Sequence, residues 1–128
     1  MRVLLDTHTL LWYLLQDPRL SRTAENLISD PATDVEVSPA SYWEIAIKIS
    51  LGKYSLPQPY QQFIETQLAA NDFRVLHIEP KHTAHLVIMP LHHRDPFDRL
   101  LIAQSLGENL PIISADIQFD AYGVQRLW

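Results

Sequence analysis

The 128-residue sequence contains no cysteine, and this absence excludes several kinds of site. Without cysteine the chain has no disulfide framework, no thiolate nucleophile and no cysteine-ligated zinc site. Its stability must come from an apolar core, and a chain of this length with 47% hydrophobic residues can bury one. We therefore expect one domain over residues 1–128, suited to a reducing cytoplasm.

Long apolar runs are also absent from the sequence. No stretch approaches the roughly 20 apolar residues that a membrane-spanning helix needs. The first strand-like run already begins at Arg2, which leaves no room for a signal peptide before it. The sequence therefore predicts a cytoplasmic protein with no membrane association.

The sequence also lacks an excess of basic residues, because its formal net charge is −5. Taken alone, this charge argues against a protein that grips nucleic acid through a broad basic face. The objection weakens if several acidic residues hold a divalent cation, because the metal reverses the local charge where a phosphate approaches.

Strand-like and helical patterns alternate along the chain. Short apolar runs predict strands at residues 2–5, 35–37, 75–78, 110–114 and near 124–127. Helical patterns occupy residues 10–15, 21–28, 38–52, 60–70, 81–89 and 95–107. Strands separated by helices imply parallel pairing with right-handed crossovers, and hence a three-layer α/β domain.

Acidic residues recur where these strands end. Asp6 and Asp116 directly follow apolar strand candidates, and Glu44 lies near the start of the helix after the second strand. Asp95 and Asp98 lie in the first turn of the helix that leads to the Asp116 strand. Ligands bind beyond the carboxyl ends of parallel strands, so these carboxylates are expected at one edge. Such a cluster repels itself unless a cation lies in it, and hard oxygen ligands select Mg²⁺ or Mn²⁺.

Several of these acids also have a simpler local explanation. Asp6 could cap the helix after the first strand, and Asp95 stands before Pro96 as helix caps do. Glu44 and Ser41 form a Ser-x-x-Glu pattern typical of a capping box, and Asp116 could begin a turn. Whether Asp95 is a ligand or only a cap stays open.

Other polar residues near these acids allow two interpretations each. Ser114 and Thr7 could orient ligands or bond to backbone, and Arg94 and Arg99 could meet RNA phosphates or be ordinary exposed arginines. The histidines suggest zinc, because His82 and His85 are three apart and His92 and His93 are adjacent. No third ligand follows at a recognisable spacing, so a histidine metal site is not expected.

Four blocks of the sequence together resemble the successive motifs of PIN domains, particularly those of VapC-type toxins. The blocks are residues 3–12, 44–48, 94–104 and 113–116, in the family's order and across nearly the whole chain. The resemblance implies a three-layer α/β/α sandwich with a mainly parallel five-stranded sheet. It also implies Mg²⁺-dependent endoribonuclease activity, with Mn²⁺ as a possible substitute, homodimerisation and inhibition by a cognate antitoxin protein.

The same resemblance assigns roles to individual residues. Asp6, Glu44, Asp98 and Asp116 match the family's catalytic, metal-site carboxylates, and Asp95 is a further candidate ligand. These residues would hold one or two ions that activate water to cleave a single-stranded RNA phosphodiester. The RNA substrate and the metal count are not fixed by the sequence.

Three other functions compete with this prediction. A Mg²⁺-binding phosphoacceptor domain would carry paired acids after the first strand, where Asp6 stands alone. A phosphatase with an aspartyl nucleophile would carry a second aspartate where His8 stands. A catalytically silent PIN-fold interaction module is the third, although all four carboxylates of the motifs are present.

Overall fold

The computed structural model describes residues 1–128, and its elements alternate as the sequence predicts. The strands are β1 (Arg2–Leu5), β2 (Asp34–Val37), β3 (Arg74–Val75), β4 (Ile112–Ile113) and β5 (Arg126–Leu127). The helices are α1 (Thr7–Leu14), α2 (Arg22–Ser29), α3 (Pro39–Ser50), α4 (Tyr60–Ala70), α5 (Pro80–Ile88) and α6 (Pro96–Glu108). A 3-10 helix, η1 (Ile117–Tyr122), was not foreseen. None of the helices has both the length and the apolar character needed to cross a membrane.

The five strands form one sheet in the order β3-β2-β1-β4-β5. Every neighbouring pair is parallel, and the register places Leu5 opposite Ile113 and Val37 opposite Val75. The predicted five-stranded parallel sheet is therefore confirmed. From β1 the chain moves to β2 on one side, and β4 later joins β1 on the other, so the strand order reverses between β1 and β4. Such a reversal opens a crevice at the carboxyl ends of the two strands.

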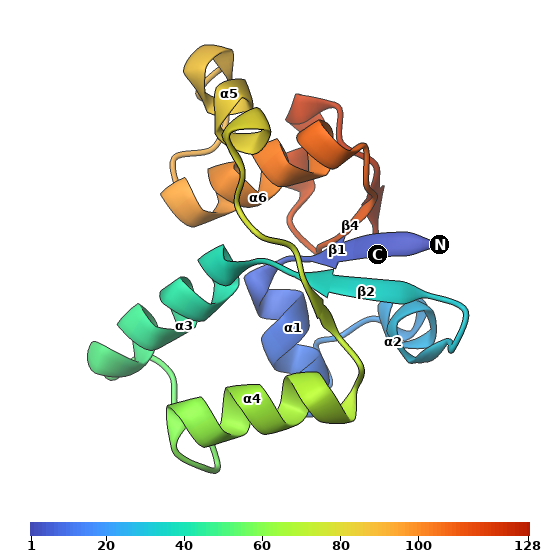
Figure 1. Ribbon diagram of the computed structural model, residues 1–128, viewed down its shortest axis with the longest axis vertical. Helices are drawn as coiled ribbons and strands as arrows, with labels where there is room; N and C mark the ends of the chain where they lie inside the picture. Colours follow the sequence, from blue (N-terminus) through green and yellow to red (C-terminus); the bar gives the residue numbers. More distant parts are fainter.

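Helices cover both faces of the sheet, as Figure 1 shows, with α5 and α6 on one side and α1 and α4 on the other. Alternate residues of β1 serve the two layers, because successive side chains of a strand point to opposite faces. Val3 and Leu5 belong to the core cluster that includes α1, α2, α3 and α4 residues. Leu4 belongs to the second cluster, with Leu101 and Ile102 of α6. The predicted three-layer sandwich is confirmed.

Polar side chains fix where the helices near the carboxyl edge begin. Asp6 caps α1 by accepting from the Thr9 amide, and Asp95 caps α6 by accepting from two amides of its first turn. Ser38 caps α3 by accepting from the Ala40 amide, at the start expected for a helix over residues 38–52. Ser41 and Glu44 both lie inside the helix, so the alternative that they form a capping box is wrong.

Helices α5 and α6 pack closely because Gly107 faces His82. A Cβ atom on Gly107 would lie 3.0 Å from Cδ2 of His82, which is fully buried. The absence of a side chain therefore sets how near the start of α5 can approach the end of α6. This pair holds the loop before α6, and with it the acidic residues that open that helix.

Candidate metal centre at the carboxyl edge of the sheet

Asp6 directly follows β1 and Asp116 follows the neighbouring strand β4, and Ser114 joins the two. The Ser114 hydroxyl donates to Oδ2 of Asp6 at 2.5 Å and accepts from the Asp116 amide at 3.0 Å. Asp6 is buried, and burial raises the pKa of its carboxyl while the hydrogen bonds from Ser114 and Thr9 oppose the rise. Ser114 thus bonds both to a carboxylate and to backbone, which combines the two roles considered for it.

Glu44 reaches the same edge from the second turn of α3. It is 3% exposed, and its Oε1 atom is buried without any hydrogen-bond partner. Burial, together with the nearby charge of Asp95, raises the pKa of Glu44. Beside it, the Thr7 hydroxyl donates to the Ser41 hydroxyl at 3.0 Å. A buried carboxylate oxygen without a donor is costly unless a cation or a proton satisfies it.

Asp98 is the carboxylate most affected by its neighbours. Burial is the largest cause that raises its pKa to about 8, and the charges of Asp95, Glu44, Asp6 and Asp116 raise it further. All five predicted acids therefore lie close enough to interact at one edge. Asp95 is a helix cap as predicted, with Oδ1 accepting from the amides of Phe97 and Asp98. Its role as a ligand stays a prediction.

His93 completes the cluster, and the sequence analysis missed it. Its Nε2 lies 2.9 Å from Oδ2 of Asp116 and 3.2 Å from Oδ2 of Asp98. The three side chains offer ligand atoms within 4.8 Å of one another. The signal was its position two residues before the Asp95 cap, where a loop side chain can fold back beside the first turn of α6. Searching for metal-ligand spacing could not reveal this contact.

The arginines near the cluster have different environments. Arg99 donates to the carbonyl oxygens of Met89, Pro90 and His93, so it braces the loop before α6 and is not free to meet phosphates. Arg94 is exposed beside Asp95. On another side of the cluster, the Tyr54 hydroxyl lies 3.2 Å from Nε2 of His8.

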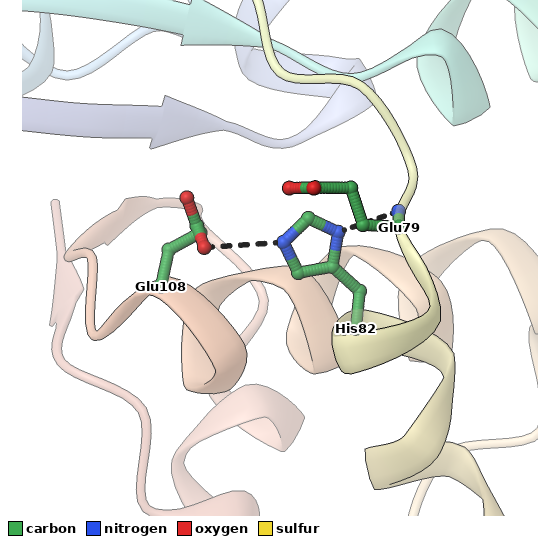
Figure 2. A group of neighbouring side chains, drawn as sticks. All are labelled: Glu79, His82 and Glu108. Carbon is green, nitrogen blue, oxygen red and sulfur yellow. Dashed lines mark hydrogen bonds and ion pairs between the residues drawn. The ribbon is translucent and has the colours of Figure 1, made fainter.

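A second group that could be mistaken for a metal site lies between α5 and α6, and Figure 2 shows its residues Glu79, His82 and Glu108. The Glu79 amide donates to Nδ1 of His82 at 3.0 Å, so the proton of the neutral ring is on Nε2. That nitrogen faces Oε2 of Glu108 at 3.3 Å, and Lys81 also pairs with Glu108. A protonated nitrogen cannot ligate a metal, so this group links two helices.

The first cluster, in contrast, fits a hard cation. It offers carboxylate oxygens from β1, α3, α6 and the segment after β4, and Glu44 has an oxygen without a partner. Burial first, and then four neighbouring carboxylates, raise the pKa of Asp98 to about 8, and a bound cation would favour its charged form. Oxygen donors of this kind are those that Mg²⁺ and Mn²⁺ prefer.

Comparisons with known proteins identify the family of the chain. The PIN domain family matches residues 3–125 of the chain. Ribonuclease VapC22 of Mycobacterium tuberculosis (strain ATCC 25618 / H37Rv) is 29% identical over 115 residues, which cover 89% of this chain and 86% of the relative. Ribonuclease VapC16 of the same organism is 33% identical over 72 residues, which cover 53% of this chain and only about half (51%) of the relative.

Solved structures share the fold at low sequence identity. A chain in the structure of VapBC2 from Rickettsia felis, bound to a DNA fragment from their promoter, has a TM-score of 0.74 and 14% identity. The alignment covers 99% of this chain and 98% of that one. A chain of VapBC-1 from nontypeable Haemophilus influenzae has a TM-score of 0.67 and 19% identity, with 99% and 97% covered.

Proposed function

The chain belongs to the PIN domain family, and on that premise we propose that it is a metal-dependent endoribonuclease that cleaves single-stranded RNA, acting as the toxin of a type II toxin–antitoxin pair. The observation that carries the proposal is the meeting of Asp6, Glu44, Asp98 and Asp116 at one edge, with a buried Glu44 oxygen that lacks a partner. The names of the two ribonuclease relatives support the same activity.

The four carboxylates would hold Mg²⁺, with Mn²⁺ as a substitute. When bound, such an ion lowers the pKa of a coordinated water and stabilises negative charge on a phosphodiester. Asp95 already gives one oxygen to the first turn of α6, so it is the weakest candidate for a ligand. Its negative charge acts on Asp98 and Glu44 through space and strengthens the attraction for a cation.

The remaining polar groups have supporting roles. Ser114 donates to the Asp6 carboxylate and accepts from the Asp116 amide, so it links the segment after β1 to the segment after β4. Arg94 is exposed beside Asp95 and would contact an RNA phosphate. A contact of this kind is made to the sugar-phosphate backbone and carries no base preference.

Two protein partners belong to the proposal. The similar structures are VapBC assemblies, which supports a cognate antitoxin protein as inhibitor of this chain. A second copy of the chain is the other partner. At the end of α5, Val87 and Ile88 are each 84% exposed and Leu91 is 70% exposed, and a homodimer interface would remove this apolar surface from water.

Single-residue variants test the activity. Asp6→Asn and Asp116→Asn should each abolish Mg²⁺-dependent cleavage of a single-stranded RNA and any growth arrest, while circular dichroism shows a retained fold. Asp72→Asn is the matched control, because Asp72 is exposed and its positive φ of 54° suits asparagine as well. Full cleavage by both site variants would contradict the proposal. Intact RNA with the wild type, despite antitoxin binding, would indicate a silent interaction module.

A further inference from the structure

The His93 ring is fixed by contacts on both of its nitrogens. Nδ1 accepts from the backbone amide of Asp95 at 3.2 Å, and Nε2 lies between Oδ2 of Asp116 and Oδ2 of Asp98. The ring also packs edge-on against Phe119, with 5.9 Å between ring centroids, and only 11% of the side chain is exposed. Its backbone amide donates to the Tyr122 hydroxyl at 2.7 Å. The ring is therefore held in one orientation.

These contacts decide which ring nitrogen carries the proton. A backbone amide can only donate, so Nδ1 must offer its lone pair to Asp95. The proton of the neutral ring is then on Nε2, where it is donated to Oδ2 of Asp116, and Oδ2 of Asp98 lies 3.2 Å from the same nitrogen. A nitrogen that carries a proton has no lone pair for a metal. His93 accordingly donates within the cluster and differs from the histidines that ligate metals.

We propose that His93 is a positioning residue of the metal centre, holding Asp98 and Asp116 from outside so that their remaining lone pairs face the cation. This inference rests on the proposed metal-dependent function. Each carboxylate oxygen can accept more than one bond, so the contact with His93 leaves room for a cation.

The two aspartates depend on His93 to different degrees. Asp116 is also held by the Gln118 amide, which donates to its Oδ1 at 2.9 Å. The Asp98 carboxylate has no hydrogen bond from the rest of the protein, and its one ion-pair neighbour is Nε2 of His93, 3.2 Å from its Oδ2. Groups that orient metal ligands from behind raise affinity because the site no longer has to be ordered on binding. Loss of the ring should therefore act on both aspartates, because it removes one of two donors to Asp116 and the ion-pair neighbour of Asp98.

Two substitutions separate the contacts of the ring. In His93→Gln the side-chain amide nitrogen can reach the Nε2 position and still donate to the carboxylates. In His93→Asn the side-chain carbonyl lies near the Nδ1 position and can still accept from the Asp95 amide, but the donor to Asp98 and Asp116 is lost. His92→Asn is the control, because the neighbouring His92 is exposed and packs against Tyr122, 5.2 Å between ring centroids.

The measurement is calorimetric titration of the RNA-free, full-length protein with Mn²⁺. We expect His93→Asn to weaken Mn²⁺ binding by about 10- to 100-fold, the usual effect of losing such a partner. His93→Gln should restore most of the affinity, and His92→Asn should match the wild type. Thermal unfolding in chelator should give similar midpoints for His93→Asn and His93→Gln. If His93 had only a structural role, these two variants would not differ in Mn²⁺ affinity.

Spectroscopy provides a second readout. Long-range ¹H–¹⁵N correlation of the histidine rings in metal-free protein should show His93 protonated on Nε2. Pulsed electron paramagnetic resonance of the Mn²⁺ complex should show the same nitrogen couplings in the wild type and in His93→Asn. A nitrogen coupling that His93→Asn removes would make His93 a direct ligand, and a proton on Nδ1 would equally overturn the inference.

The outcomes also separate this inference from the proposed function. Unchanged or tighter Mn²⁺ binding by His93→Asn, with binding lost in Asp98→Asn, would overturn the positioning role and leave the metal centre standing. A wild-type protein that binds no Mn²⁺ at all would overturn both. Failure of His93→Gln to recover any affinity would show that donation from the Nε2 position is not what matters.

Discussion

Replacing Asp98 by asparagine should make the metal-free protein less sensitive to alkaline pH. The pKa of Asp98 is raised from 3.8 to about 8, first by burial and then by the surrounding carboxylates. Between pH 3.8 and about pH 8, the Asp98 carboxyl is protonated in the folded state and ionised in the unfolded state. The free energy of unfolding therefore falls as pH rises through this window and levels off above about 8. Asparagine is neutral throughout and removes this dependence.

The size of the effect follows from the same pKa. Each pH unit in the window is worth about 1.4 kcal/mol per proton. Between pH 6 and pH 9 the wild type crosses the last two units below the Asp98 pKa of about 8, a loss of about 3 kcal/mol. The side chain is only 17% exposed, so solvent screening reduces this figure little. At pH 6 the variant and the wild type should have similar stability, because both side chains are then neutral.

Urea unfolding in chelator, followed by tryptophan fluorescence at pH 6, 7, 8 and 9, measures this directly. The stability of Asp98→Asn relative to the wild type should grow by about 3 kcal/mol across the series. Asp72→Asn, at an exposed position, should track the wild type at every pH. A difference between Asp98→Asn and wild type that does not change with pH would refute the reasoning.

Three further predictions concern the same cluster and the helices that support it. Mn²⁺ affinity should rise about tenfold per pH unit between pH 6 and 8, because binding must release the Asp98 proton; a flat calorimetric profile would contradict this. Ser114→Ala should lower the free energy of unfolding, measured by urea titration, by about 2 kcal/mol, since Asp6 loses a charge-assisted donor. Ser29→Ala, at an exposed position, is the control and should change it little. Gly107→Ala should lower the free energy of unfolding by about 1 kcal/mol, because the new Cβ meets buried His82. Equal or greater stability would mean that the His82 ring moves aside freely.

The order of strands and helices could be predicted because its signals are local. Asp95 before Pro96 marks the start of α6, and the structure begins that helix at the expected residue. The short apolar run before Asp6 and the one before Asp116 both became strands, at the centre of the sheet. Parallel pairing then followed from the intervening helices, and with it the prediction that both acids share an edge.

Contacts between distant segments could not be predicted in the same way. The Ser114–Asp6 hydrogen bond and the position of His93 between Asp98 and Asp116 depend on how loops fold over the sheet, which no periodicity encodes. Glu44 is a related case, because its spacing from Ser41 is typical of a capping box although Ser38 caps the helix three residues earlier. Competing serines three residues apart make such boundaries ambiguous.

The pairing of β4 with β1 has a consequence for the newly made protein. Ser114 and its partner Asp6 are 108 positions apart, and the central strand β1 gains its neighbour β4 only when residues 112–113 are available. Pairings of such long separation form late in folding. A growing polypeptide on the ribosome would therefore hold an incomplete carboxylate cluster until residues 112–116 have been made and paired with β1.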